Sequence, residues 1–205
     1  MIVCDIEYVK ACLQGHTVMR HVNAVARKQI IEEIDRLSEL EMSIYLPSVS
    51  KIDLIPSIGG KTDSTYRAYQ KLENSKIESE RKSLYEQLQD IDANEHRMKR
   101  VIISYHKMSG IMPLHYSIVN NLWFSSSPNN QRESIHTLKR SLNRGADTLY
   151  KMLEDMAEAV CCIANSAIPT RSIGRAKQSS LLSLMPGELV TRMRKHESNT
   201  RIESK

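Results

Sequence analysis

Apolar residues recur at helical spacing over residues 23–46, and this pattern constrains the fold more than any other feature of the sequence. Charged residues cover the opposite face, so the apolar stripe is narrow, as in a helix that packs on one partner helix. Pro47 predicts the end of this helix. The stripe consists of Ile30, Ile34, Leu37, Leu40 or Glu41, and Ile44.

A second stripe of the same kind follows after an intervening segment. Residues 48–64 contain Pro56, Gly59, Gly60 and several serines, which is the composition of a loop. Helical spacing then returns over about 65–91. Two narrow stripes joined by one loop predict a long antiparallel helical hairpin. The second stripe consists of Ile77, Leu84, Leu88 and Ile91.

The loop contains the sequence GGKT at residues 59–62, which resembles the end of a phosphate-binding loop. That motif needs a first glycine five positions before the second, and Ile55 stands at this place. No apolar strand precedes the segment as the motif requires. We therefore interpret GGKT as part of the hairpin loop, and we predict neither nucleotide nor any other cofactor.

The composition favours an all-α fold. Only one Trp and one Phe are present, and Ile, Leu, Val and Met at helical spacings supply the rest of the expected core. No apolar run is long enough to span a membrane, and Asp5 and Glu7 interrupt the N-terminal region where a signal peptide would be apolar. We expect a cytoplasmic protein.

The net charge of +5 is concentrated at the C-terminal end of the chain. Residues 165–205 hold eight Lys or Arg against three Asp or Glu, and the remainder of the chain holds 21 of each sign. A basic tail on a neutral body suggests an acidic partner such as nucleic acid, or else a solvated chain end.

Cysteine and histidine residues do not form a recognisable site. Cys4 and Cys12 lie near His16 and His21, but the eight-residue step does not match the usual spacing of zinc ligands, so metal binding there stays an open question. No nucleophile lies beside a base in the sequence, and the seven histidines are scattered among basic or polar neighbours. We predict no enzymatic activity.

Residues 133–160 carry the pattern of a helix-turn-helix. Leu138 and Leu142 are four apart, and Leu149 follows seven positions later, which is the spacing of this motif. Asn143 tolerates the left-handed backbone that the turn needs, and Gly145 or Asp147 would cap the second helix.

Seven residues of this motif are the candidate DNA contacts. An exposed face near the start of the second helix would enter the major groove, and basic residues beside the turn would lie near phosphates. The groove face consists of Ala146, Asp147, Tyr150 and Lys151, and the phosphate contacts are Lys139, Arg140 and Arg144.

The order of elements resembles the sigma-like phage regulators of the RinA/ArpU type. A charged hairpin is followed by LxYxIVxxLWF and then by IxxLxxxLNxxxxTLYKxLxxMAEAV, over roughly residues 21–160. The resemblance implies a supporting helix at 134–142 and a recognition helix at 148–160, as in region 4 of sigma-70 factors. It implies transcription regulation through double-stranded DNA. We expect the hairpin to contact RNA polymerase or to form a homodimer.

The chain departs from that family at three places. Lys139 replaces a small residue, Arg144 replaces an apolar one, and the loop at 125–132 is longer than usual. A second interpretation therefore stays open: a non-enzymatic helical adaptor, or protein-interaction module, with a degenerate helix-turn-helix.

We expect four parts in the chain. These are an N-terminal segment at 1–22, the hairpin at 23–92 with its loop at 47–64, a helix-turn-helix domain at 93–164, and a basic linker and tail at 165–205. A short helix at 96–105 should open the third part and end before Gly110 and Pro113. The tail would add phosphate contacts, or dock on a partner through Leu181, Leu182, Leu184 and Met185.

Overall fold

A computed structural model describes residues 4–45, 64–124 and 135–198, and the side chains of residues 44–45 and 64–70 are outside this description. Helices joined by short turns make up the described residues, which contain no strand, and this confirms the predicted all-α class. The GGKT sequence and the expected loop at 125–132 lie outside the described residues. None of the described helices is both long enough and apolar enough to cross a membrane.

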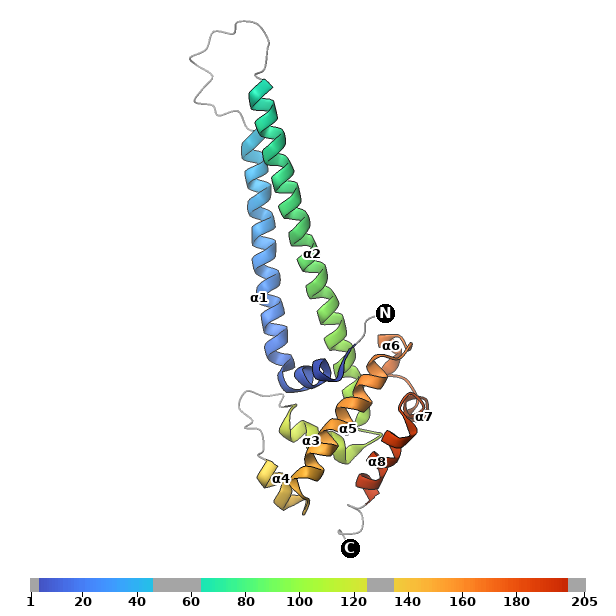
Figure 1. Cartoon of the computed structure of the whole chain (residues 1–205). Coiled ribbons are helices and arrows are strands. Elements are labelled where there is room, and N and C mark those ends of the chain that lie inside the picture. The colour runs from blue at the N-terminus through green and yellow to red at the C-terminus, as the bar shows by residue number, and fades with distance from the viewer. Residues whose placement is uncertain (1–3, 46–63, 125–134, 199–205) are drawn as a thin grey trace, which may run out of the picture. The chain divides into compact units, whose positions relative to one another are not determined.

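The helices follow one another along the chain as shown in Figure 1. Two long helices come first and six shorter ones follow in the described part of the chain. Their bounds are α1 Ile6–Tyr45, α2 Ser64–Met108, α3 Pro113–Leu122, α4 Ile135–Ser141, α5 Ala146–Ala164, α6 Thr170–Ile173, α7 Gln178–Leu182 and α8 Gly187–Ser198.

The chain divides into two units, and each boundary falls inside a long helix. Residues 21–93 form one unit, which we call the hairpin unit. Residues 1–20 and 94–205 form the other, which we call the core unit. The first boundary interrupts α1 and the second interrupts α2, so each of these helices contributes to both units.

In the hairpin unit, α1 and α2 lie side by side in opposite directions (Figure 1), as the two apolar stripes predicted. Ile30, Leu37 and Ile77 are buried between the helices. Two ion pairs join the helices near opposite ends of the unit: Arg81 Nη2 lies 2.6 Å from Glu41 Oε2, and Arg27 pairs with Asp92.

Both long helices extend beyond their predicted ends. The first begins at Ile6, with non-helical backbone at Gly15, rather than at residue 23. The second continues to Met108 through the segment at 96–105 that we expected to be a separate helix. Neither Gly nor Pro occurs between Ser64 and Met108, so nothing in the local sequence stops helix propagation there.

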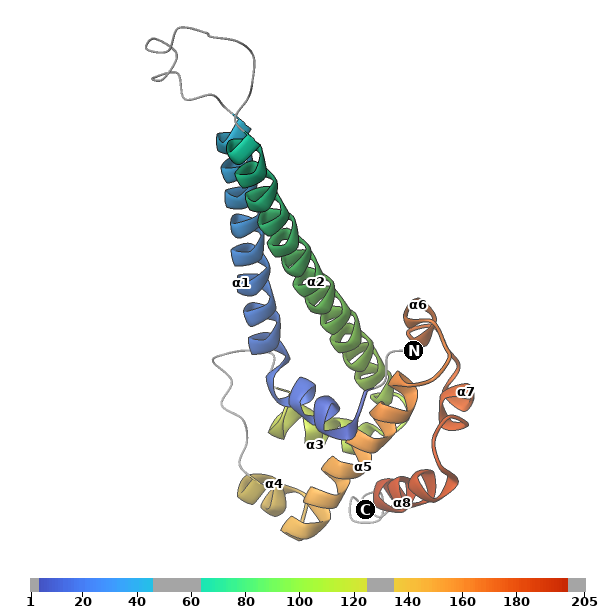
Figure 2. The same ribbon diagram turned by 45° about the horizontal axis from the view of Figure 1, so that its top comes forward.

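The core unit is built around α5. This helix buries ten of its residues and contacts α3, α4 and α8, whose arrangement is visible in Figure 2. Met108, at the end of α2, and Val9 and Leu13, from the start of α1, belong to the same apolar cluster. The protein therefore has one continuous core in this unit, formed by segments from both ends of the chain.

The expected linker and tail are part of this core up to residue 198. Ile173 on α6, Leu181 on α7, and Leu189 and Met193 on α8 are buried in the same cluster. Arg100 of α2 holds the start of this segment by donating hydrogen bonds to the carbonyl groups of Ala164 and Ser166. The Ala164 carbonyl is one of those that α5 leaves unpaired at its C-terminal end, and Ser166 follows the helix by two residues.

A candidate nucleic-acid interface at the α4–α5 corner

The turn between α4 and α5 has the backbone that the sequence predicted. Asn143 has a positive φ of 50°, a conformation that Asn tolerates better than most residues. Gly145 is the N-cap of α5, and its carbonyl oxygen accepts from the N–H groups of Thr148 and Leu149. Asp147 lies in the first turn of α5, where a negative charge is favourable. The turn thus separates two helices within four residues.

Apolar contacts hold the two helices of the corner together. Leu138 on α4 and Leu149 on α5 are buried, and Leu142 in the turn is half-buried. The spacing that suggested a helix-turn-helix is therefore the spacing of the residues that pack. Helix α3 also packs on α5, so α5 is supported along its buried face while its opposite face remains open.

Five of the seven candidate contact residues are exposed at this corner. They come from both helices: Lys139 and Arg140 from α4, and Asp147, Tyr150 and Lys151 from α5. Tyr150 leaves 55% of its surface exposed, so its ring and hydroxyl group are accessible to a partner. Ala146 is half-buried. Glu154 follows Tyr150 by one helical turn and is also exposed, so the outer face of α5 carries both signs of charge.

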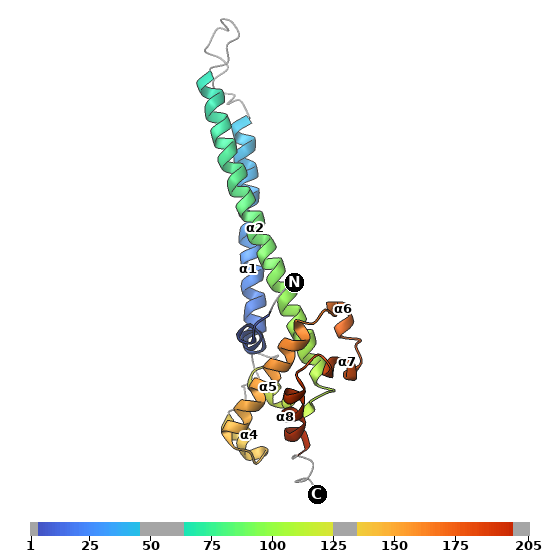
Figure 3. The ribbon, with the colours of Figure 1, turned by 45° about the vertical axis from the view of Figure 1, so that its right-hand side comes forward.

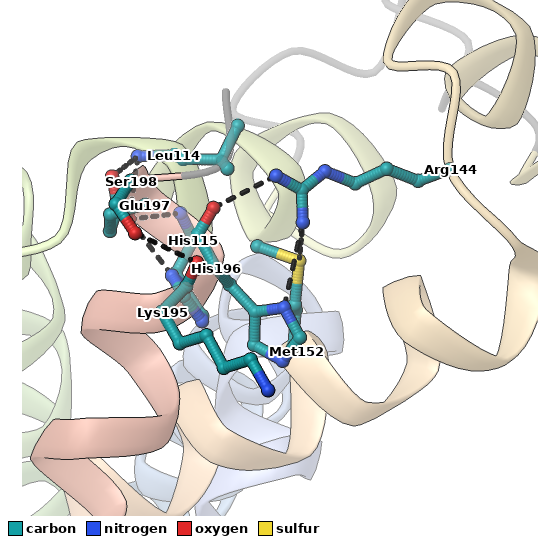
Figure 4. A network of polar contacts seen from close by, with 8 residues as sticks. All are labelled: Leu114, His115, Arg144, Met152, Lys195, His196, Glu197 and Ser198. Carbon is teal, nitrogen blue, oxygen red and sulfur yellow. Dashed lines mark hydrogen bonds and ion pairs between the residues drawn. The ribbon is translucent and has the colours of Figure 1, made fainter. Parts of the chain in front are cut away.

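Arg144 differs from the other candidates because its guanidinium group is used inside the protein. It is half-buried, and Nη2 donates to the carbonyl oxygen of His196 at 2.8 Å (Figure 4). Nη1 lies 4.0 Å from Met152 Sδ. A phosphate contact by Arg144 would have to share or replace these bonds. Sequence alone offers no signal for this partner, since His196 is 52 residues away.

Glu197 of α8 caps the start of α3. Its Oε1 accepts from the N–H group of Leu114 at 3.0 Å, from that of His115 at 3.1 Å, and from His115 Nδ1 at 2.8 Å. Burial alone would raise the pKa of Glu197, but these hydrogen bonds lower it below its usual value. The pKa of His196 is lowered by burial and by the nearby His115 and Arg144. The corner, α3 and α8 are thus joined by one polar network (Figure 4).

A further arginine fastens α8 to α5. Arg192 Nη2 lies 3.0 Å from Asp155 Oδ1 and 3.1 Å from Glu158 Oε2. Together with Arg100 and Arg144, it accounts for part of the positive charge of this unit through contacts within the fold. The basic residues on the outer surfaces of α4 and α5 are Lys139, Arg140 and Lys151.

The two units carry opposite net charges. The core unit has 19 Lys or Arg against 11 Asp or Glu, a net charge of +8, whereas the hairpin unit has 10 against 13, a net charge of −3. The part of the chain before residue 165 looked neutral in the sequence because an acidic hairpin offsets basic residues outside it. The basic character therefore belongs to the whole core unit and not to its last 41 residues alone.

The cysteines serve packing in the core unit. Cys4 and Cys12 are buried, and burial raises the pKa of Cys12 to about 11. The backbone of Cys4 exchanges hydrogen bonds with the Asn165 side chain, and its carbonyl oxygen also accepts from the Cys161 thiol at 3.2 Å. Within the described ranges, no group of three or more His, Cys, Asp or Glu residues could hold a metal ion.

Comparison of the chain with protein families, with curated proteins and with solved structures finds no match.

Proposed function

We propose that the protein is a DNA-binding transcription regulator of phage or prophage type, acting in the cytoplasm without a cofactor. One observation carries the proposal: the α4–α5 corner exposes Tyr150 and Lys151 on one helix and Lys139 and Arg140 on the other. The unit that contains this corner has a net charge of +8. A corner of this kind on a basic unit suits the major groove of double-stranded DNA.

Each exposed residue has a role that follows from its chemistry. Lys139 and Arg140 contact phosphates, which gives affinity without sequence information. Tyr150 and Lys151 lie on the open face of α5 and reach base edges, where a lysine can donate to the O6 and N7 atoms of guanine. The carboxylates of Asp147 and Glu154 can only accept hydrogen bonds, for example from the cytosine amino group. Their negative charge repels phosphates on that face of α5.

The hairpin unit supplies a second contact, with RNA polymerase or with a second copy of the chain. Its net charge of −3 does not favour a DNA backbone. Apolar side chains on its surface are suited to a protein partner, and they include Val25, Leu40, Met42 and Tyr85.

These exposed apolar residues also favour a second candidate function, the helical adaptor. In that case the hairpin would be the binding surface and the corner would only stabilise the fold. Asp147 and Glu154 on the open face of α5 support this alternative, because they weaken attraction to DNA. The two functions make opposite predictions for a titration with duplex DNA.

Binding of random and genomic duplex fragments, measured by fluorescence anisotropy over a range of salt concentrations, tests the proposal. We expect saturable binding, with Lys139→Ala plus Arg140→Ala weakening all sequences alike and lowering the salt slope by about 0.9 per contact. Tyr150→Ala plus Lys151→Ala should cost on the order of 1 to 3 kcal/mol for the preferred site and much less for random DNA.

Two outcomes would contradict the proposal, in whole or in part. Absence of duplex binding at low salt would favour the adaptor. Equal losses on preferred and random DNA would remove Tyr150 and Lys151 as base-reading residues. Lys82→Ala on the hairpin is the matched control, because Lys82 is also basic and exposed but lies outside the core unit.

A further inference from the structure

We infer that α8 supplies a second phosphate contact through Lys195, and that Arg144 joins this contact to the α4–α5 corner. The inference rests on the proposed function and narrows the phosphate contacts that the sequence suggested for the basic tail to one residue of α8. The residues concerned are Lys139 and Arg140 on α4 and Lys195 on α8, and each of them is exposed.

The position of Lys195 follows from the Arg144 contact. Arg144 stands in the turn between α4 and α5, and its guanidinium group donates to the backbone carbonyl of His196 at 2.8 Å. Lys195 is the preceding residue, and Figure 4 shows it beside the polar network that Arg144 joins. The last turn of α8 and the turn of the corner are therefore neighbours in the core unit.

In the last turn of α8, the acidic and basic side chains point in opposite directions. Glu197 points inward, since its carboxylate accepts from two N–H groups at the start of α3 and from the His115 ring. Met193 is buried in the core, and Lys195, two positions later, lies about 200° around the helix from it and is exposed. The negative group is thus used internally while the positive group faces outward.

The Arg144 contact also removes an obstacle to binding a phosphate near this end of α8. The C-terminal end of a helix carries a partial negative charge on unpaired carbonyl groups, which would repel an anion. The Arg144 guanidinium group lies against one of these carbonyl groups, at His196, and brings a full positive charge to it. The same interaction orients α8 and offsets the helix dipole.

The test compares the salt dependence of duplex binding between the wild type and three variants, all with the full chain. Lys195→Ala should reduce the slope of log affinity against log salt by about 0.9 relative to wild type, the value for one lost phosphate contact. Lys195→Arg keeps the charge and should keep the wild-type slope. Arg171→Ala is the control, because Arg171 is exposed on α6, which follows the far end of α5 (Figure 3).

The control is matched in charge and differs in position. Helix α5 has 19 residues, so its two ends are separated by roughly 28 Å. Arg171→Ala should therefore leave the slope unchanged. Circular dichroism and the melting temperature of each variant check that the fold is kept, as expected for exposed positions.

Failures of the two proposals give different results. If the wild-type protein does not bind duplex DNA, the proposed function fails. If it binds with unchanged slope in Lys195→Ala, or if Arg171→Ala lowers the slope by the same amount, the inference about α8 is overturned while the proposed function stands.

Discussion

The core unit and the hairpin unit bury their apolar residues in different ways. In the core unit, ten residues of α5 are buried, and segments from both ends of the chain pack around them. In the described part of the hairpin unit, the buried apolar side chains are Ile30, Leu37 and Ile77, and Ile34, Leu84 and Leu88 on the same seam remain half-buried. A pair of helices has one seam, whereas a bundle surrounds its central helix.

The two units also differ in net charge. A net charge of −3 on a narrow hairpin and +8 on a bundle indicate surfaces for different partners. The overall charge of +5 conceals this contrast. Because the units differ in both packing and charge, the stability and the partner of each unit can be tested separately.

The largest expected effect is on the hairpin unit. Leu37→Asp introduces an unpaired charge at a position that is 2% exposed, and we expect it to cost on the order of 3 to 5 kcal/mol. Hydrogen exchange should quicken across residues 21–45 and 64–93 and stay slow in α5. Leu40→Asp, on the same helix at an exposed position, is the control. Equal loss of protection in α5 would show that the units do not unfold separately.

The next effect concerns the core unit. Leu149→Ala removes a fully buried side chain between α4 and α5, and we expect a loss of roughly 2 to 5 kcal/mol in the free energy of unfolding. Tyr150→Ala changes the adjacent, exposed residue and should alter stability by only about 0.5 kcal/mol or less. Urea denaturation measures both. Similar losses in the two variants would contradict the packing of this corner.

A smaller effect is expected in the turn itself. At a φ of 50° the backbone of residue 143 is left-handed, a conformation that Asn tolerates better than Ala. We expect Asn143→Ala to cost about 1 kcal/mol of stability. Asn143→Gly should be neutral or stabilise by a few tenths of a kcal/mol, because Gly adopts this backbone freely. If Ala and Gly variants had the same melting temperature, the turn would not have this conformation.

The smallest effect is a loss of core-unit stability in acid. The folded pKa of His196 is lowered from 6.5 by burial, then by His115 and Arg144, so the unfolded chain binds more protons as the pH falls through 6.5. Stability should therefore decrease from pH 7 toward pH 5. Lys195 also opposes protonation of His196, whereas Asp155 on α5 favours it.

Glu197 adds a second loss at lower pH. Its folded pKa lies below the unfolded value of 4.5, so its contribution to the stability of the core unit is present above pH 4.5 and is lost as the pH falls through the folded pKa.

The contribution of His196 is measured at higher pH, by urea denaturation. Urea midpoints between pH 7.5 and 5 should fall less in His196→Gln than in wild type. An equal fall would assign the acid sensitivity to other groups.

Local patterns in the sequence determined the all-α class, the pairing of α1 with α2 and the corner between α4 and α5. The narrow stripes at Ile30 and Ile77 predicted the hairpin, because helical period and one-sided burial are both visible within a few turns. Asn143 and the spacing of Leu138 and Leu149 predicted the corner for the same reason. The exposure of Tyr150 and Lys151 also followed from their phase on the helix.

Only the tertiary structure decided what the basic residues contact and where the chain end lies. Arg100, Arg144 and Arg192 look like surface charges in the sequence, yet each binds a partner between 34 and 66 residues away. Ile173, Leu181 and Leu189 lie in short segments that are too brief to show a clear helical stripe, and the core of α5 buries them. Periodicity reports which face of a helix is apolar, but the partner of that face depends on how distant segments pack.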